Sequence, residues 1–282
     1  MKNKNQKRIY IFLASLLIFT TAVSVLSSFI TNQNLWSVLI MWTPGLAALL
    51  VSFITKRSLK QIGWKLSLKW MLAGWLFPVV YATVAYSAVW IFSFGDVPNP
   101  TFLERARLTL GIDSGSDSIV IISAFFYITV VNLLPAAVMA LGEEIGWRGF
   151  LVPELTAWIG LKKAGWISGI IWGVWHLPGI LTGNYAQQGT PLWFQLTCFF
   201  ILVISTAIIL AWLRMKSGSI LPAVIFHATH NGVVQMFYNR ITIDTGNTNW
   251  FTGEFGFALV PVLILISIYV LKRMDKMQKI PM

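Results

Sequence analysis

Long apolar runs are the feature that most constrains how this chain can fold. Eight runs of about 18 residues or more occur along its 282 residues, at roughly 9–30, 35–54, 70–94, 118–141, 164–181, 191–213, 219–238 and 255–271. A helix needs about 20 apolar residues to cross the hydrocarbon core of a bilayer. Only 11% of the residues are charged, against about 25% in an ordinary soluble domain. The sequence therefore predicts an all-α, polytopic membrane protein with about eight transmembrane helices, organised as one domain over residues 1–282.

The basic residues indicate how these helices are oriented. With the N-terminus inside and eight crossings, 18 of the 21 Lys and Arg residues fall on the inner side, and only Arg105, Arg107 and Arg240 fall outside. Cytoplasmic loops of membrane proteins carry such an excess of Lys and Arg. We therefore expect an N-in, C-in, multi-pass protein of the cell membrane. The same clusters explain the net charge of +11 without a nucleic-acid partner, for which the chain has no motif.

Two further features narrow the class of protein. The first apolar run is longer than the roughly 7–15 residues of a secretory signal and is followed by no A-x-A-like cleavage site, so we expect it to remain as a helix. The single cysteine, Cys198, excludes an intrachain disulfide framework and a Cys-rich zinc site.

Two adjacent carboxylates, Glu143 and Glu144, stand at the end of the fourth apolar run in a chain with only ten acidic residues. Ionisable groups at membrane depth are costly and usually face a bundle interior or a wet cavity. Glu144 and Arg148 are spaced i,i+4, so they share one helix face and can pair, whereas Glu143 lies about 100° round the helix. A poorly solvated carboxylate without a cation suits a general base. The alternative is a solvated helix end with an exposed ion pair, but glycines at 142, 146 and 149 favour close helix packing.

All three histidines of the chain also lie in apolar runs. His176 follows Trp172 and Trp175 in the fifth run, and alone it could be a hydrogen-bonded structural group. In the seventh run, His227 and Asn231 are spaced i,i+4, and the second histidine of that run lies at i+3. These polar groups could instead be interhelical hydrogen-bond partners. Because every histidine and the only adjacent acid pair gather in this way, we expect a functional site within a motif core of about 118–238.

The order of these motifs resembles a known family. An E-E-x-x-x-R motif, an aromatic-x-x-x-H motif and an H-x-x-x-N motif, each on its own apolar run, are similar to those of the CPBP family of CAAX-processing and bacteriocin-processing membrane peptidases, also called Abi. Type II CAAX prenyl endopeptidases are among its members. The matching residues are Glu143, Glu144, Arg148, Trp172, His176, His227 and Asn231. One departure is Trp172, where the family more often has phenylalanine. The basic segment 55–69 looks like that of bacterial members, which implies a bacterial plasma membrane.

The resemblance implies an intramembrane endopeptidase and a role for each matching residue. Glu143 and His176 would activate a water for attack on the scissile carbonyl, and His227 with Asn231 would stabilise the oxyanion. The supporting residues would be Glu144 and Arg148, which pair and fix the helix end. Three residues are expected to line the substrate-binding site: Trp172, Trp175 and His230.

The chemistry and the partners leave alternatives open. We favour no cofactor, but zinc could be held by Glu143, His176 and His227, since a catalytic zinc needs three protein ligands and an open position. The expected partners are the lipid bilayer and a membrane-associated or lipidated peptide or protein substrate. The main alternative function is a bacteriocin immunity or membrane binding protein of the same fold with little or no proteolysis. A small transporter using the acid and histidines as a proton relay is disfavoured, because no inverted repeat is visible.

Overall fold

The computed structural model describes residues 2–26, 29 and 32–278, and within them the expected all-α class is confirmed. No strand occurs in these residues beyond two isolated bridges, Trp64 with Ser219 and Asp96 with Ile243. The α-helices are α1 (Lys2–Leu26), α2 (Gln33–Ile54), α3 (Leu68–Ile91), α4 (Pro100–Leu110), α5 (Asp117–Phe126), α6 (Leu133–Glu144), α7 (Val152–Ile159), α8 (Leu161–Leu181), α9 (Leu192–Ser217), α10 (Leu221–His230), α11 (Asn239–Ile241) and α12 (Leu259–Gln278). Short 3-10 turns are η2 (Leu59–Ile62) and η6 (Thr248–Trp250). Three π-helical segments are η3 (Tyr127–Val131), η4 (Ile145–Leu151) and η5 (Asn231–Tyr238).

Several of these helices are long and apolar enough to cross a membrane. Among the described residues five qualify by length and hydropathy, namely α1, α2, α3, α8 and α9. A sixth is added if 117–131 and 133–159, which meet at a 44° bend, count as one span. The protein is therefore a multi-pass membrane protein. The expected runs at 219–238 and 255–271 correspond to α10 with η5 and to α12, which do not meet the same criterion, so the count of eight and the N-in, C-in orientation stay predictions.

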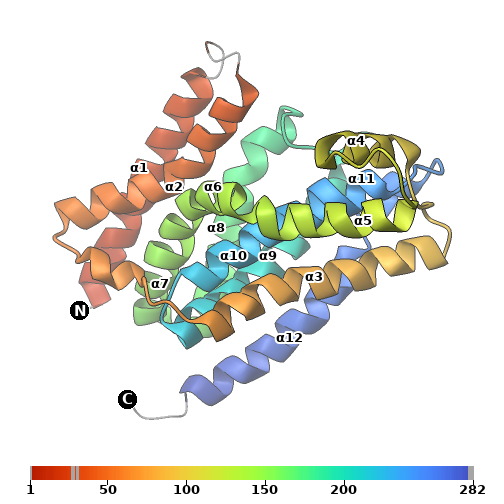
Figure 1. The fold of residues 1–282 in the computed structure, drawn as a ribbon. Coiled ribbons are helices and arrows are strands. Elements are labelled where there is room, and N and C mark those ends of the chain that lie inside the picture. The colour runs from red at the N-terminus through yellow and green to blue at the C-terminus, as the bar shows by residue number, and fades with distance from the viewer. Residues whose placement is uncertain (1, 27–28, 30–31, 279–282) are drawn as a thin grey trace.

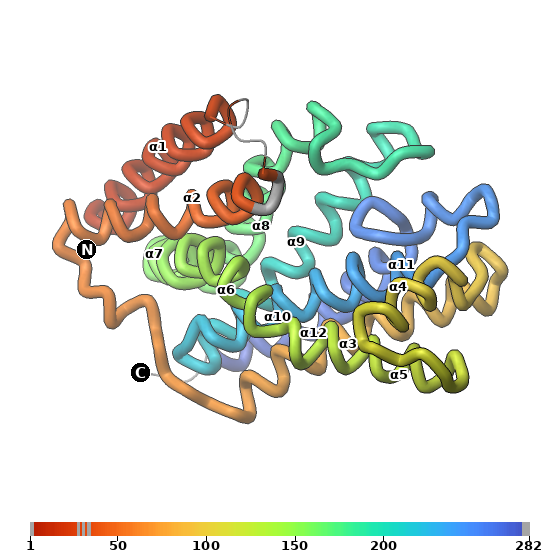
Figure 2. The backbone as a smooth tube through the Cα atoms, turned by 45° about the horizontal axis from the view of Figure 1, so that its top comes forward, coloured from red at the N-terminus to blue at the C-terminus, as the bar shows by residue number. Residues whose placement is uncertain are grey.

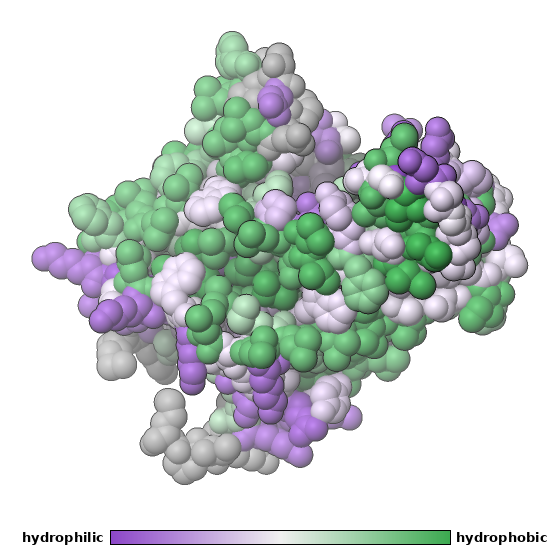
Figure 3. Space-filling model, viewed as in Figure 1, coloured by the Kyte–Doolittle hydropathy of each residue, from purple (hydrophilic) through white to green (hydrophobic). Residues whose placement is uncertain are grey.

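The helices pack around a central path made of α6, η4 and α7. Figure 1 shows this path inside the molecule, with the α1–α2 hairpin on one flank and α3 and α10 on the other. Figure 2, turned by 45°, shows α6 and α7 between α2, α8 and α10. The start of α1 and the end of α12 lie at the same end of the molecule (Figure 1). On the visible face, apolar residues cover the middle and hydrophilic residues gather toward the edges (Figure 3), as a bilayer would require.

Close contact between α2 and the central path depends on two glycines. A Cβ on Gly142 would lie 2.8 Å from the carbonyl oxygen of Met41, and one on Gly146 would lie 2.4 Å from Pro44. Small residues at helix crossings allow such close backbone approach in membranes. The close packing predicted from the glycines around the acid pair is confirmed, and it brings α2 directly over that pair.

The central path continues into the interior after the acid pair. Every residue of η4 is buried, and α7 follows it with Leu155 only 1% exposed. Helix α7 packs against α1 and α8, and the Leu155 side chain belongs to the hydrophobic core.

Candidate active site

The first carboxylate of the pair, Glu143, is held by two tryptophans. Its Oε2 accepts hydrogen bonds from Nε1 of Trp147 at 3.0 Å and from Nε1 of Trp172 at 2.7 Å. We expected Glu143 to lack a cation, and no Lys or Arg pairs with it among the described residues. The indole N–H groups satisfy one oxygen without neutralising the charge. The other oxygen, Oε1, accepts no hydrogen bond from the described residues.

The second carboxylate, Glu144, joins two of the motifs. Its Oε1 accepts from Nη1 of Arg148 and from Nδ1 of His227, each at 2.9 Å. The predicted i,i+4 pair is therefore confirmed, and a histidine from α10 completes it. Glu143, Glu144 and Arg148 are only 2%, 0% and 1% exposed, so the alternative of a solvated helix end is wrong.

For His176 and His227, a hydrogen bond determines which tautomer the neutral imidazole adopts. Nδ1 of His176 lies 2.9 Å from the carbonyl oxygen of Trp172, which can only accept, so Nδ1 carries the proton and Nε2 keeps its lone pair. His227 likewise directs Nδ1–H at the Glu144 carboxylate. In both histidines Nε2 is therefore the atom left for chemistry.

Trp172 contacts several of these groups, whereas the sequence predicted only that it lines the substrate-binding site. Its indole N–H reaches Glu143, its carbonyl holds His176, and the Arg148 guanidinium carbon lies 4.2 Å from the centroid of its ring. The ring centroid of His227 is 5.5 Å away. A phenylalanine at this position could stack in the same way but could not donate to the carboxylate. The departure from the family pattern thus adds a hydrogen bond to Glu143.

The remaining expected site residues occupy different surroundings. The indole of Trp175 donates to Thr20 Oγ1 of α1 at 2.9 Å, while its ring packs edge-on against His176 with centroids 4.7 Å apart. Asn231 begins η5, is partly buried, and makes no side-chain hydrogen bond within the described residues. His230 is buried and bound away from this cluster: its Nε2 lies 2.8 Å from Glu254 Oε1.

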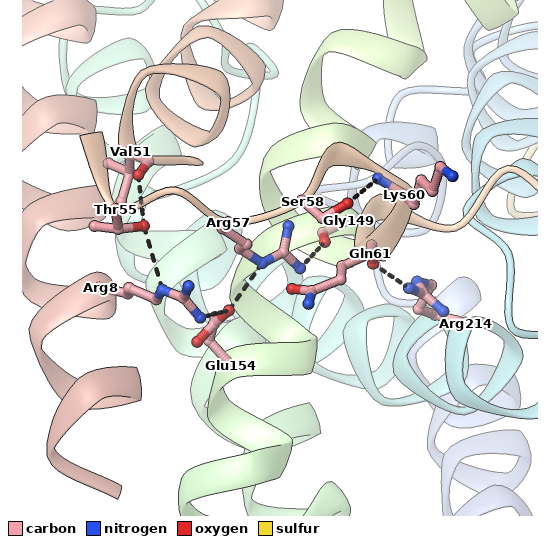
Figure 4. Close-up of polar contacts among 10 residues, drawn as sticks. All are labelled: Arg8, Val51, Thr55, Arg57, Ser58, Lys60, Gln61, Gly149, Glu154 and Arg214. Carbon is pink, nitrogen blue, oxygen red and sulfur yellow. Dashed lines mark hydrogen bonds and ion pairs between the residues drawn. The ribbon is translucent and has the colours of Figure 1, made fainter. Parts of the chain in front are cut away.

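Two buried arginines that the charge pattern assigns to membrane orientation also support the site, and Figure 4 shows the bonds of Arg57 to Gly149 and Glu154. Arg214 Nε donates to the carbonyl of Arg148 at 3.0 Å, and Arg57 Nη2 donates to the carbonyl of Gly149 at 3.0 Å. Arg57 Nε also pairs with Glu154 of α7 at 2.8 Å. Two consecutive carbonyls of η4 are therefore bound by arginine side chains from outside the central path. These bonds hold the turn that carries Arg148. Burial lowers the pKa of Arg57, and the charge of Glu154 opposes this shift.

Sequence reasoning missed Trp147, Glu254 and the structural role of Arg57. Trp147 sits four residues after Glu143, and that spacing was the one available signal. Glu254 lies in the loop before α12 with no motif around it. Burial alone would raise the pKa of Glu254, but hydrogen bonds and charge from His230, with bonds from Tyr185 and Gln235, lower it to about 2.

The zinc alternative would need Glu143, His176 and His227 to bind one ion. Among the described residues, no group of three or more His, Cys, Asp or Glu side chains is arranged to hold a metal ion. In the expected set of Glu143, His176 and His227, Oε2 of the carboxylate and both Nδ1 atoms are engaged, which leaves Oε1 and both Nε2 atoms as possible ligand atoms. The zinc alternative therefore stays a prediction, and the steps proposed below use no metal.

The fold and this cluster define a class: a helical, multi-pass membrane protein whose interior holds two carboxylates, an arginine and two histidines. Comparison with known proteins agrees with that class. Residues 119–233 match the family described as type II CAAX prenyl endopeptidase Rce1-like. A protein named CAAX prenyl protease 2, from Methanococcus maripaludis, is 36% identical over 105 residues, which cover 36% of this chain and 38% of that protein. Over residues 119–233 the chain is therefore similar to the Rce1-like family, and the resemblance read from its motifs is confirmed.

Proposed function

We propose that this protein is an intramembrane endopeptidase that hydrolyses a peptide bond with a water activated by Glu143 and His176. The observation that carries the proposal is the convergence of three motifs at one buried place. Glu143 and His176 are both bound to Trp172, and Glu144 joins Arg148 to His227. The match to a peptidase family over these same residues supports it.

The hydrogen bonds suggest how the residues divide the work. Oε1 of Glu143 is the oxygen available to take a proton from the attacking water, because Oε2 is occupied by two indoles. Nε2 of His176 can accept a second hydrogen bond from that water and orient it. The proton held by Glu143 is then returned to the amine that leaves as the C–N bond breaks.

The oxyanion would be stabilised from α10 and η5. Nδ1–H of His227 already donates to Glu144, so His227 can donate to an oxyanion only through a protonated Nε2. The buried Glu144 carboxylate favours that positive charge. The Asn231 amide would supply a second donor. Each such donor commonly contributes about 3–4 kcal/mol to transition-state stabilisation.

The substrate class follows from the relative's name and from the surroundings of the site. The relative is named a CAAX prenyl protease. We extend this to the present chain by proposing a membrane-associated, lipidated peptide as its substrate. Apolar helices surround the site, and a lipid-anchored peptide would reach it by diffusing in the bilayer.

A comparison of protein termini tests the activity directly. Membrane proteins from cells with the wild type or Glu143→Gln are compared by mass spectrometry, with Glu104→Gln, an exposed glutamate on α4, as the matched control. New termini should be present with the wild type and with Glu104→Gln and absent with Glu143→Gln. Identical termini in all three, with a protective phenotype retained, would instead support an immunity or binding protein.

A purified assay separates the chemistry from the cell. With a prenylated reporter peptide in lipid vesicles, Glu143→Gln should lower kcat by about 10²–10⁴-fold, as expected for loss of a general base. Activity should survive a strong chelator. Loss on chelation with rescue by zinc would overturn the cofactor-free assignment while leaving the peptidase assignment intact.

A further inference from the structure

A second buried polar cluster lies beside the candidate active site and belongs to none of its motifs. Its centre is Glu254, in the loop between η6 and α12, which is only 8% exposed. Its carboxylate accepts hydrogen bonds from His230 Nε2 at 2.8 Å, from Gln235 Nε2 at 3.0 Å and from the hydroxyl of Tyr185. We call these four residues, with Tyr81, the Glu254 cluster. It ties the loop after α8 to α10 and η5.

The protonation pattern of this cluster is determined by its hydrogen bonds. The hydroxyl of Tyr81 contacts Nδ1 of His230, whose Nε2 faces the Glu254 carboxylate. Since a carboxylate only accepts, Nε2–H of His230 donates to Glu254, and Nδ1 pairs with the Tyr81 hydroxyl, which can act as donor or as acceptor. Every bond then has one donor and one acceptor. A cluster satisfied in this way holds its members in fixed positions.

The cluster reaches both histidines of the candidate site. The ring of Tyr185 packs against His176, with centroids 5.3 Å apart and planes at 32°. His230 lies one helical turn after His227 on α10. His176 lies on α8 and His227 lies on α10. Glu254 accepts a hydrogen bond from a neighbour of each: Tyr185 beside His176, and His230 beside His227.

We propose that Glu254 is a positioning residue for the peptidase reaction: it holds Tyr185 against His176 and, through His230, holds the turn of α10 that carries His227. The proposal rests on the proposed function, because positioning has meaning only if these histidines act on a substrate. Its physical basis is that a displacement of reacting groups by about 1 Å can lower a rate by roughly 10²-fold. Glu254 contacts neither His176 nor His227, and it acts on them through Tyr185 and His230.

A purely structural role would be to anchor the loop, and the chain offers a matched control for it. The hydroxyl of Tyr86 accepts from the backbone N–H of Gly253 at 2.9 Å and contacts the Asn239 side chain. It thus holds the residue next to Glu254 without packing on His176 or lying on α10. Tyr86→Phe loosens the same loop, while Tyr185→Phe removes the bond to Glu254 and retains the ring.

The kinetic test compares these variants in lipid vesicles with a prenylated reporter peptide. Tyr185→Phe and Glu254→Gln should each lower kcat about tenfold, the factor for one lost hydrogen bond to a charged group, with KM within about twofold. Tyr86→Phe should keep both constants. An equal fall in kcat for Tyr86→Phe and Tyr185→Phe, or a change confined to KM, would overturn the proposal.

A labelling test needs no peptidase activity. Diethyl pyrocarbonate modifies the free imidazole nitrogen, and the modification of His176 is followed by mass spectrometry of the purified protein. Tyr185→Phe should speed this modification severalfold, and Tyr86→Phe should leave it unchanged. An unchanged rate in Tyr185→Phe overturns the positioning role. A wild type that labels as expected but cleaves no peptide counts against the proposed function alone.

Discussion

Removing the arginine of the buried pair, by Arg148→Met, is expected to lower the free energy of unfolding by about 3–5 kcal/mol. The size follows from the surroundings of Glu144. This carboxylate is fully buried, its Oε2 already has no hydrogen-bond partner, and its Oε1 would keep only His227. The methionine fills most of the volume, so the cost comes mainly from the buried charge that is left. Unfolding is measured reversibly in mixed micelles of lipid and sodium dodecyl sulfate.

The double variant Glu144→Gln with Arg148→Met separates charge from packing. The amide oxygen can still accept from Nδ1 of His227, and no buried charge is left unpaired. We therefore expect the double variant to recover most of the lost stability and to lie within about 1–2 kcal/mol of the wild type, since neutral replacements of buried pairs are often tolerated. Equal losses in the single and double variants would refute this reasoning, because the arginine would then stabilise through packing alone.

Three further predictions concern other parts of the fold. Gly146→Ala should lower the free energy of unfolding by about 1–3 kcal/mol, because the added Cβ would lie 2.4 Å from an atom of α2. Gly165→Ala should leave the stability unchanged or raise it slightly, because the atoms nearest to its Cβ would lie at 3.4 Å. Thermal unfolding in detergent compares the two variants. Glu254 has a folded pKa of about 2 against 4.5 in the unfolded chain, so its contribution, on the order of 3 kcal/mol, is complete above pH 4.5 and is lost as the pH falls toward 2. The stability difference between the wild type and Glu254→Gln should shrink over that range, and a constant difference would contradict the assignment. Arg57→Met should raise hydrogen–deuterium exchange at residues 145–151, because a carbonyl of η4 loses its donor.

The parts of this structure that could be predicted from the sequence depend on local spacing. The pairing of Glu144 with Arg148 follows from an i,i+4 interval, and close packing by Gly142 follows from its size and its place beside the acids. The helical class follows from the apolar runs. In each case the physical constraint acts within one helix or on one helix face.

The parts that could not be predicted depend on contacts between distant segments. Trp172 donates to a residue 29 positions earlier, and Arg57 binds a carbonyl 92 positions later. Charge patterning assigned Arg57 to the membrane surface, because a cation near an inner helix end has the same sequence signature whether it faces lipid headgroups or a buried carbonyl. Glu254 stood in a polar loop with nothing nearby in the sequence to mark its burial.

The π-helical segments have a consequence for how this chain tolerates changes in length. Both η4 and η5 begin within a motif, directly after Glu144 and at Asn231. A π-helical segment has more residues per turn than an α-helix, so it is equivalent to an α-helix that has received an insertion. A one-residue deletion there could restore regular winding, but it would turn everything downstream by about 100° and carry Glu154 away from Arg57. Insertions and deletions should therefore be accepted in the loops of this protein and rejected within these two segments, even where the deleted side chain contacts nothing of importance.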